Sequence, residues 1–232
     1  ATSCSYIGQI YFAQNDYSKA LDYFKKSLKL DLSFFGENHP SVASGYYNIG
    51  YVYFAQGDYS KALEYFEEVL KIRLSVYGEN HSRVASVYND IGEIYSVQGD
   101  DFKALDYFKK SLKIVLSVYG ENHSQVSSIY DHIGEIYFAQ KDYSKALYYF
   151  EESLKIRLSL FGENHPEVAL SYYSIGSLYI IQGDKSKALN YYEKSLKIRL
   201  SVYGENHPLT KEIMDLINVA NSKVLQSPET TK

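Results

Sequence analysis

The chain has 232 residues, a formal net charge of −4 and a single cysteine. This mild acidity argues against sequence-independent binding of nucleic acid, which needs a basic face. One cysteine excludes an internal disulfide and suits a reducing, cytoplasmic location, and no apolar run approaches the length that spans a bilayer, so we expect no membrane partner.

Five near-copies of one amphipathic stretch organise the sequence. They begin at Tyr17, Tyr59, Asp101, Tyr143 and Lys185, each 42 residues after the last. Self-similarity at a fixed period of this size predicts a repeat array, in which each copy buries its apolar face against its neighbours. We count repeat positions from Ala1 and add 42 each time. The five repeats occupy residues 1–208 and comprise 1–39, 40–81, 82–123, 124–165 and 166–207.

The first half of each repeat predicts a helix, called helix A, which runs from about Pro40 to Gln56 in the second repeat. Its recurrent residues at positions 4, 7, 8 and 11 share one helical face. Position 8 is glycine in every copy, although glycine destabilises a helix interior. We therefore predict that a partner helix approaches closely at this position. The glycines concerned are Gly8, Gly50, Gly92, Gly134 and Gly176.

The second half of each repeat predicts a longer helix, called helix B. An aspartate precedes it in every copy and fits the N-cap. The residue before that aspartate is glycine in three copies, Asn15 in the first and Lys141 in the fourth, and it fits the left-handed residue that ends helix A. A Gly-Glu-Asn-His segment then follows helix B in every copy. We expect its glycine to stop helix B and its histidine to cap the next helix A.

The pattern changes after Pro208. Ile213, Leu216 and Ala220 continue an apolar stripe, but the recurrent glycine and tyrosine are gone. A terminal helix that covers the last repeat accounts for this change, because the end of a repeat array needs a cap. We predict a capping helix over 208–226 and a disordered tail over 227–232.

The signature of Gly8, Tyr11, Ala20 and Phe24, distributed over two helices per repeat, resembles the tetratricopeptide repeat. That family usually has 34 residues per repeat. The longer period here, with segments such as Gln56–Tyr59 and Phe161–Ala169, is similar to the kinesin-light-chain type of array. The resemblance implies an all-α fold: a right-handed α-α superhelix, or solenoid, of five helix-turn-helix repeats plus a C-terminal capping helix.

The resemblance also implies that helix A lines a concave groove that binds proteins. The stripe opposite the packed face of helix A, at positions 2, 5, 6, 9 and 13, varies between copies, and we call it the A-helix stripe. It appears aromatic at both ends, acidic in the middle and free of lysine and arginine. The candidate groove residues are Tyr47, Asn48, Tyr51, Asn89, Asp90, Glu93, Asp131, His132, Glu135, Tyr173 and Ser174.

Two features of the kinesin-light-chain type are missing from this stripe. The Asn pair that this type often carries at positions 5 and 6 is matched only by Asn48 and Asn89. The basic residues that bind acidic cargo peptides in such grooves are not found. We therefore do not extend the cargo of kinesin light chains to this chain, and we expect a partner segment with Lys or Arg near its centre and aromatic or apolar anchors.

These observations predict a scaffold for protein–protein interaction that binds an extended peptide or a partner helix. One alternative is a structural spacer, or a module that self-associates weakly through its terminal repeats. A less favoured alternative is binding of single-stranded RNA, because the acidic stripe repels phosphate. We predict no enzyme, no cofactor and no metal site, since the recurrent histidines lie too far apart to share one ion. His132 is expected to be a solvated polar residue, with ligand binding or pH sensing as the alternative.

Overall fold

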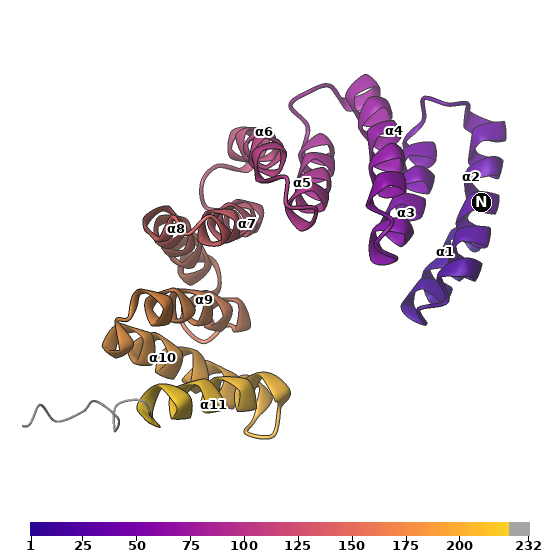
Figure 1. Cartoon of the computed structure of the whole chain (residues 1–232). Helices are drawn as coiled ribbons and strands as arrows, with labels where there is room; N and C mark the ends of the chain where they lie inside the picture. The colour runs from indigo at the N-terminus through magenta and orange to yellow at the C-terminus, as the bar shows by residue number, and fades with distance from the viewer. Residues whose placement is uncertain (223–232) are drawn as a thin grey trace, which may run out of the picture. The chain divides into compact units, whose positions relative to one another are not determined.

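The computed structural model describes residues 1–222 and is built from helices alone in that range (Figure 1). The chain divides into two compact units, Ala1–Gly120 and Glu121–Lys232, which we describe separately. The first unit contains α1 (Thr2–Ala13), α2 (Tyr17–Phe35), α3 (Pro40–Ala55), α4 (Tyr59–Tyr77), α5 (Ser82–Val97) and α6 (Asp101–Tyr119). The second contains α7 (Ser124–Ala139), α8 (Tyr143–Phe161), α9 (Pro166–Gln182), α10 (Lys185–Tyr203) and α11 (Pro208–Ser222).

The predicted pairing of helices A and B is confirmed. Odd-numbered helices from α1 to α9 are the A helices, and the even-numbered helices that follow them are the B helices. Each helix packs against its neighbours along the chain within its own unit, and α11 packs against α10. The end of the predicted capping helix after residue 222 and the whole predicted tail over 227–232 lie outside the described residues. None of the described helices combines the length and the apolar character needed to cross a bilayer.

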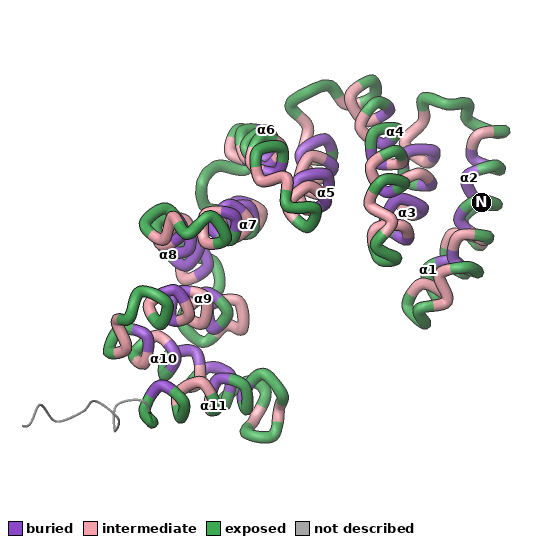
Figure 2. The backbone as a smooth tube through the Cα atoms, viewed as in Figure 1, coloured by how far each residue is buried: buried purple, intermediate pink, exposed green. Residues whose placement is uncertain are grey.

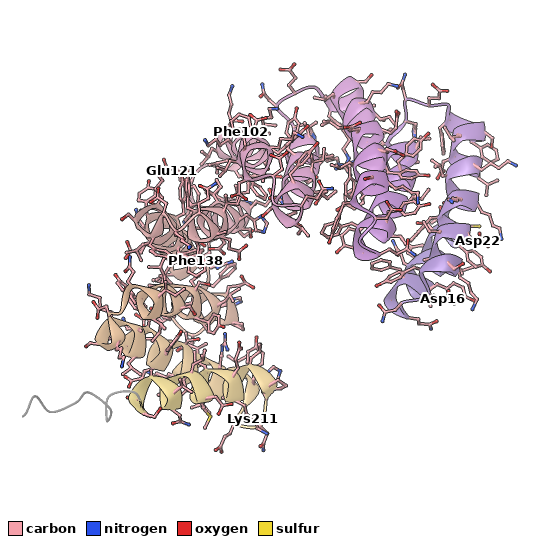
Figure 3. The ribbon with its side chains drawn as sticks, in the orientation of Figure 1. Asp16, Asp22, Phe102, Glu121, Phe138 and Lys211 are labelled. Carbon is pink, nitrogen blue, oxygen red and sulfur yellow. The ribbon has the colours of Figure 1, made fainter. Side chains whose placement is uncertain are left out.

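The aspartate before each B helix is its N-cap, as predicted. Asp16 lies at the turn between α1 and α2 (Figure 3), and its side chain accepts a hydrogen bond from the backbone N–H of Lys19 at 3.2 Å. The same bond recurs at Asp58, Asp100, Asp142 and Asp184. Each cap satisfies a backbone donor that the first turn of a helix leaves without a partner, so the start of every B helix is fixed by one residue.

The histidine of each Gly-Glu-Asn-His segment begins the next A helix, as predicted. His39 Nδ1 accepts a hydrogen bond from the backbone N–H of Ser41 at 3.1 Å, and its ring stacks on Phe35 with ring centroids 4.2 Å apart. The backbone N–H bond is repeated in the other four copies of the segment. The described residues contain no group of three metal-ligating side chains. The recurrence of histidine is therefore explained by capping.

Each glycine at repeat position 8 of an A helix faces a large ring of its partner helix. A Cβ atom built on Gly134 would lie 2.7 Å from a ring carbon of Phe150, and one on Gly92 would lie 2.9 Å from Phe108. Both rings are buried, and the buried stretches of the backbone lie where the paired helices face each other (Figure 2). Real Cβ atoms do not approach so closely, so glycine is required where the two helices meet. The predicted reason for the recurrent glycines is confirmed.

The residue that follows each A helix and precedes the N-cap of helix B has a left-handed backbone in all five repeats. Gly57, Gly99 and Gly183 have φ near +80°, and Asn15 and Lys141 adopt φ of 60° and 62° at the same repeat position. A residue with a Cβ atom pays about 1–2 kcal/mol in this conformation, although asparagine tolerates it better than lysine. The fourth repeat therefore carries avoidable strain at this turn.

Replacing Lys141 with glycine is expected to raise the free energy of unfolding by about 1 kcal/mol, because the strain is relieved at a position that already has positive φ. Urea unfolding followed by circular dichroism measures this change. Lys155→Gly is the matched control, since Lys155 lies exposed within α8 and glycine in a helix interior destabilises by about 1 kcal/mol. Equal destabilisation by both substitutions would contradict the assignment of strain to Lys141.

Candidate functional site

The predicted groove residues lie on four A helices, divided between the two units. In the first unit, α3 carries Tyr47, Asn48 and Tyr51, and α5 carries Asn89, Asp90 and Glu93. In the second unit, α7 carries Asp131, His132 and Glu135, and α9 carries Tyr173 and Ser174. Only Tyr51 and Glu135 are exposed, and the other nine are half-buried. The A-helix stripe is thus a partly covered surface.

An aromatic cluster forms the N-terminal part of the stripe in the first unit. The Tyr51 ring lies 5.4 Å from Phe12 of α1, 6.3 Å from Tyr47 and 6.2 Å from Phe54, measured between ring centroids. Tyr51 remains 44% exposed. Aromatic rings in such arrangements attract one another beyond simple area burial. The cluster therefore offers a preformed apolar surface, to which the sequence analysis did not assign Phe12.

Polar side chains of the stripe are held by contacts within and between A helices. Asn48 Nδ2 donates a hydrogen bond to Ser5 Oγ of α1 at 3.4 Å. On α5, Asn89 Nδ2 donates to Glu93 Oε1 at 2.6 Å, one helical turn away. Burial raises the pKa of Glu93, and the hydrogen bond from Asn89 opposes that rise. These contacts fix the side chains that border the aromatic cluster.

Asp90 is the most perturbed carboxyl group of the stripe. Burial and the neighbouring Glu93 raise its pKa from 3.8 to about 7, against the opposing effects of a hydrogen bond with Tyr47 and the charge of Arg73. Its Oδ2 atom is buried and accepts no hydrogen bond within the described part of the chain. A carboxylate in such surroundings lacks the solvation that it has in water, so the neutral form is favoured. Burial and Asp90 also raise the pKa of Tyr47.

The raised pKa of Asp90 predicts a distinctive pH dependence. The folded protein holds the Asp90 proton to about pH 7, whereas the unfolded chain releases it near pH 4, so stability falls as pH rises between these values. From pH 5 to pH 8 the native protein should lose about 2 kcal/mol more stability than Asp90→Asn, which has no proton to release. Chemical unfolding at the two pH values measures this difference, and parallel pH profiles would contradict it.

Arginines that the sequence analysis missed reach the stripe from the B helices. They occupy repeat position 31 and approach the residue at position 5 of the same repeat. The stripe positions of helix A carry no lysine or arginine, but a long arginine side chain on helix B reaches the stripe residue at position 5. The position 5 and 31 pairs are Ser5 with Asp31, Tyr47 with Arg73, Asn89 with Val115, Asp131 with Arg157 and Tyr173 with Arg199.

Arg157 is the centre of the polar network in the fourth repeat. Its side chain is 5% exposed and forms ion pairs with Asp131 at 2.7 Å and Glu167 at 2.9 Å. It also donates a hydrogen bond to Ser171 Oγ at 2.8 Å. The positive charge of Arg157, on helix α8, thus partly neutralises the predicted acidic patch on α7. The ring atom Nδ1 of His132 is buried, so the expectation of a solvated histidine is wrong. Burial, assisted by the charge of Arg157, lowers the pKa of His132 from 6.5 to about 4.

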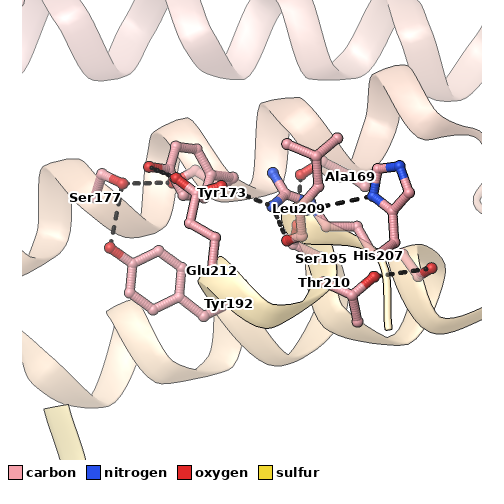
Figure 4. A network of polar contacts seen from close by, with 10 residues as sticks. Ala169, Tyr173, Ser177, Tyr192, Ser195, His207, Leu209, Thr210 and Glu212 are labelled. Carbon is pink, nitrogen blue, oxygen red and sulfur yellow. Dashed lines mark hydrogen bonds and ion pairs between the residues drawn. The ribbon is translucent and has the colours of Figure 1, made fainter. Parts of the chain in front are cut away.

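A related network closes the C-terminal end of the stripe (Figure 4). The Arg199 guanidinium lies 5.0 Å from the centre of the Tyr173 ring and donates a hydrogen bond to the carbonyl oxygen of Leu209 at 2.6 Å. The Tyr173 hydroxyl donates to Glu212 Oε1 of α11 at 3.1 Å. Tyr173 is therefore oriented by α10 and α11 together, and a cation already occupies one face of its ring. The neighbouring Ser174 is half-buried.

A signal for these arginines is present in the sequence. Repeats with arginine at position 31 have tyrosine or aspartate at position 5. The third repeat has the apolar Val115 at position 31 and the neutral Asn89 at position 5. The pairing is visible only once helices A and B are known to meet at these positions, because 26 residues separate the two members. Reading each helix alone hides it.

The sequence profile of the tetratricopeptide repeat matches residues 1–75, 42–116, 83–159 and 125–201 in four overlapping segments. No curated protein matches the chain. Among solved structures, BtubC (BKLC) from P. vanneervenii is 24% identical, with a TM-score of 0.77 over 88% of this chain and 81% of that chain. A putative kinesin light chain of Podosopora anserina with nearly identical TPR-like repeats is 16% identical, with a TM-score of 0.72 over 87% of this chain and 96% of that chain.

A Rap protein complexed with Competence and Sporulation Factor shares the fold as well. It is 17% identical, with a TM-score of 0.67 over 94% of this chain and 64% of that chain. Identities this low establish a common fold only, whereas the profile matches extend over most of the sequence and follow its repeats. The chain belongs to the tetratricopeptide repeat family.

Proposed function

We propose that the protein is an interaction scaffold that binds an extended peptide or a partner helix along the A-helix stripe. The observation that carries this proposal is the exposed Tyr51 ring, held by Phe12, Tyr47 and Phe54, with Tyr47 in turn hydrogen-bonded to Asp90 of α5. Rigid aromatic side chains in a partly covered surface are typical anchors of protein interfaces. The fold supports this use, because repeat arrays present extended binding surfaces and a Rap protein of the same fold has been solved in complex with a factor.

The chemistry of the partner follows from the charge and the burial of the carboxyl groups on the stripe. Asp131 is paired with Arg157, and Asp90 is half-protonated near pH 7, so neither attracts a cation as strongly as its sequence suggests. Glu93 is half-buried on α5, where it accepts a hydrogen bond from Asn89, and Glu135 is exposed on α7. We propose a segment with an aromatic or apolar anchor for the Tyr51 cluster and a lysine or arginine near Glu93 of the same unit, and Glu135 is the corresponding carboxylate of the second unit.

Selection from a peptide library, followed by fluorescence anisotropy of the enriched peptides, tests this proposal. Tyr51→Ala should weaken binding about tenfold or more, since truncating an aromatic anchor removes the centre of the contact. Phe102→Ala is the matched control, because Phe102 is 85% exposed on the B helix α6 and points away from the paired helices (Figure 3). Enrichment of acidic peptides, or equal losses from both substitutions, would contradict the proposal.

Charge reversal tests the electrostatic part separately. Glu93→Lys combined with Glu135→Lys should abolish binding of basic peptides and leave the melting temperature nearly unchanged, because neither side chain is fully buried. Added salt should weaken binding to the native protein. The alternative of a self-associating spacer predicts instead a molecular mass that rises with concentration in sedimentation equilibrium and no peptide that depends on Glu93 or Glu135.

A further inference from the structure

The first repeat lacks the arginine that three other repeats carry at position 31, and a cavity lies in its place. Position 31 is Asp31 here, and the cavity has a volume of about 190 Å³. Small or polar residues of α1, α2 and α3 line it together with Asp31. They are Ala1, Thr2, Ser5, Ser27, Ser41, Ser44, Gly45 and Asn48.

Other repeats show what the same surroundings hold. In the second repeat, Arg73 donates hydrogen bonds to the carbonyl oxygen of Arg83 at 2.7 Å and to Ser86 Oγ at 2.9 Å. The residues at the equivalent positions one repeat earlier, 42 residues before, are Ser41 and Ser44, and both line the cavity. In the fifth repeat, Arg199 likewise donates to the carbonyl oxygen of Leu209, which is the counterpart of Ser41. The cavity thus presents acceptors that elsewhere bind a guanidinium group.

Asp31 supplies a negative charge that complements a guanidinium group. Its residue is only 7% exposed, and no lysine or arginine forms an ion pair with it in the described part of the chain. A carboxylate that faces a cavity without a cation favours a positively charged ligand, and a guanidinium group can offer it up to five N–H donors in a fixed plane. The hydroxyls of Ser5 and Ser44 keep acceptor capacity, because Ser5 Oγ accepts one bond from Asn48 and Ser44 Oγ donates to Pro40.

We propose that this cavity binds an arginine side chain of a partner, seated where Arg73, Arg157 and Arg199 lie in their own repeats. The inference rests on the proposed function, since the arginine belongs to the peptide that the A-helix stripe binds. Asn48 connects the two, because it belongs to the stripe and also lines the cavity. Arginine is favoured over lysine, since a planar fork satisfies the carboxylate and the α3 acceptors together, whereas an ammonium group is a point charge.

Titration with N-acetyl-arginine amide, followed by amide chemical shifts of residues 41–48, tests the site directly. We expect saturable shifts with blocked arginine, weaker shifts with blocked lysine and none with blocked citrulline, which has the same shape without the charge. A sample with an acetylated N-terminus controls for the α-amino group of Ala1, which also lines the cavity. Equal responses to arginine and citrulline would overturn the proposal.

Two substitutions at one position sharpen the test. Asp31→Asn removes the charge and should weaken binding of blocked arginine about tenfold or more. Asp31→Arg lets the chain fill its own cavity, as in the second, fourth and fifth repeats, and should abolish binding while the melting temperature stays the same or rises. Ser44→Leu, at an exposed position on α3, should also block the cavity. It replaces the Asp31 variants in the test if either of them fails to fold. Undiminished binding in the folded variants would overturn the proposal.

The outcome is separable from that of the peptide selection. Tyr51 and Glu93 do not line the cavity, so their substitution tests the stripe without affecting the arginine site. Library peptides that bind equally well to the native protein and to Asp31→Arg would refute the arginine site and leave the scaffold function standing. Binding of blocked arginine without any selected peptide would support the cavity as an arginine site and refute the scaffold function.

Discussion

Gly134→Leu is expected to destabilise the second unit by more than about 3 kcal/mol. Even a Cβ atom at this position would lie 2.7 Å from the Phe150 ring, which is buried and cannot swing into solvent. Overpacking a close helix contact costs about 1–3 kcal/mol for modest insertions, and the leucine adds three further carbon atoms. Urea unfolding of the native and variant proteins measures the loss.

Two other glycines calibrate this result. Gly162→Ala should cost about 1–3 kcal/mol from the backbone alone, because φ of 75° with ψ of 176° is a region that only glycine adopts readily and nothing lies within 4 Å of the added atom. Gly50→Ala should cost less than Gly134→Ala, since the nearest atom to its Cβ is 3.1 Å away and not 2.7 Å. A neutral Gly134→Leu substitution would show that helix α8 does not pack against α7 as closely as described.

The second large effect is expected at Arg157. Replacing it with leucine should lower the free energy of unfolding by about 3–5 kcal/mol, because Asp131 then stays largely covered without its cation. Lys155→Ala is the control on the same helix, where an exposed lysine sits 3.7 Å from Glu152, and it should change stability by less than about 1 kcal/mol.

A double substitution separates packing from charge. Asp131→Leu together with Arg157→Leu should recover most of the loss, since an apolar residue is accommodated at position 31 in the third repeat, where Val115 is buried. Denaturant unfolding of all three variants supplies the comparison. A double variant no more stable than Arg157→Leu alone would show that the ion pair is not the source of the loss.

The repeated parts of the fold were predictable because each depends on residues close in sequence. Asp58 caps the helix that it precedes, and Gly57 supplies the left-handed turn immediately before it. The third repeat departs from the pattern, because its aromatic residue, Phe102, lies one position later than Tyr59 and Tyr143 do in their repeats. Phe102 is 85% exposed, whereas Tyr59 and Tyr143 are half-buried. Such features need no knowledge of the tertiary packing.

The electrostatics of the candidate surface could not be predicted in this way. Asp90 and Asp131 look alike in the sequence, at adjacent positions of successive repeats. One lies beside Glu93 with a raised pKa near 7, while the other forms an ion pair with Arg157. The difference is made by residues on other helices, so it appears only when helix B is placed against helix A. Whether the eleven predicted groove residues bind a partner stays a prediction.

A footprint of a selected peptide on the protein tests the central claim most directly. Hydrogen exchange, measured by mass spectrometry with and without a bound library peptide, reports which helices become protected. We expect new protection on α3 and α5 or on α7 and α9, which carry Tyr51, Glu93, Glu135 and Tyr173. Protection confined to the B helices α6 and α8, where Phe102 and Tyr148 are exposed, would contradict the claim that the A-helix stripe is the binding surface.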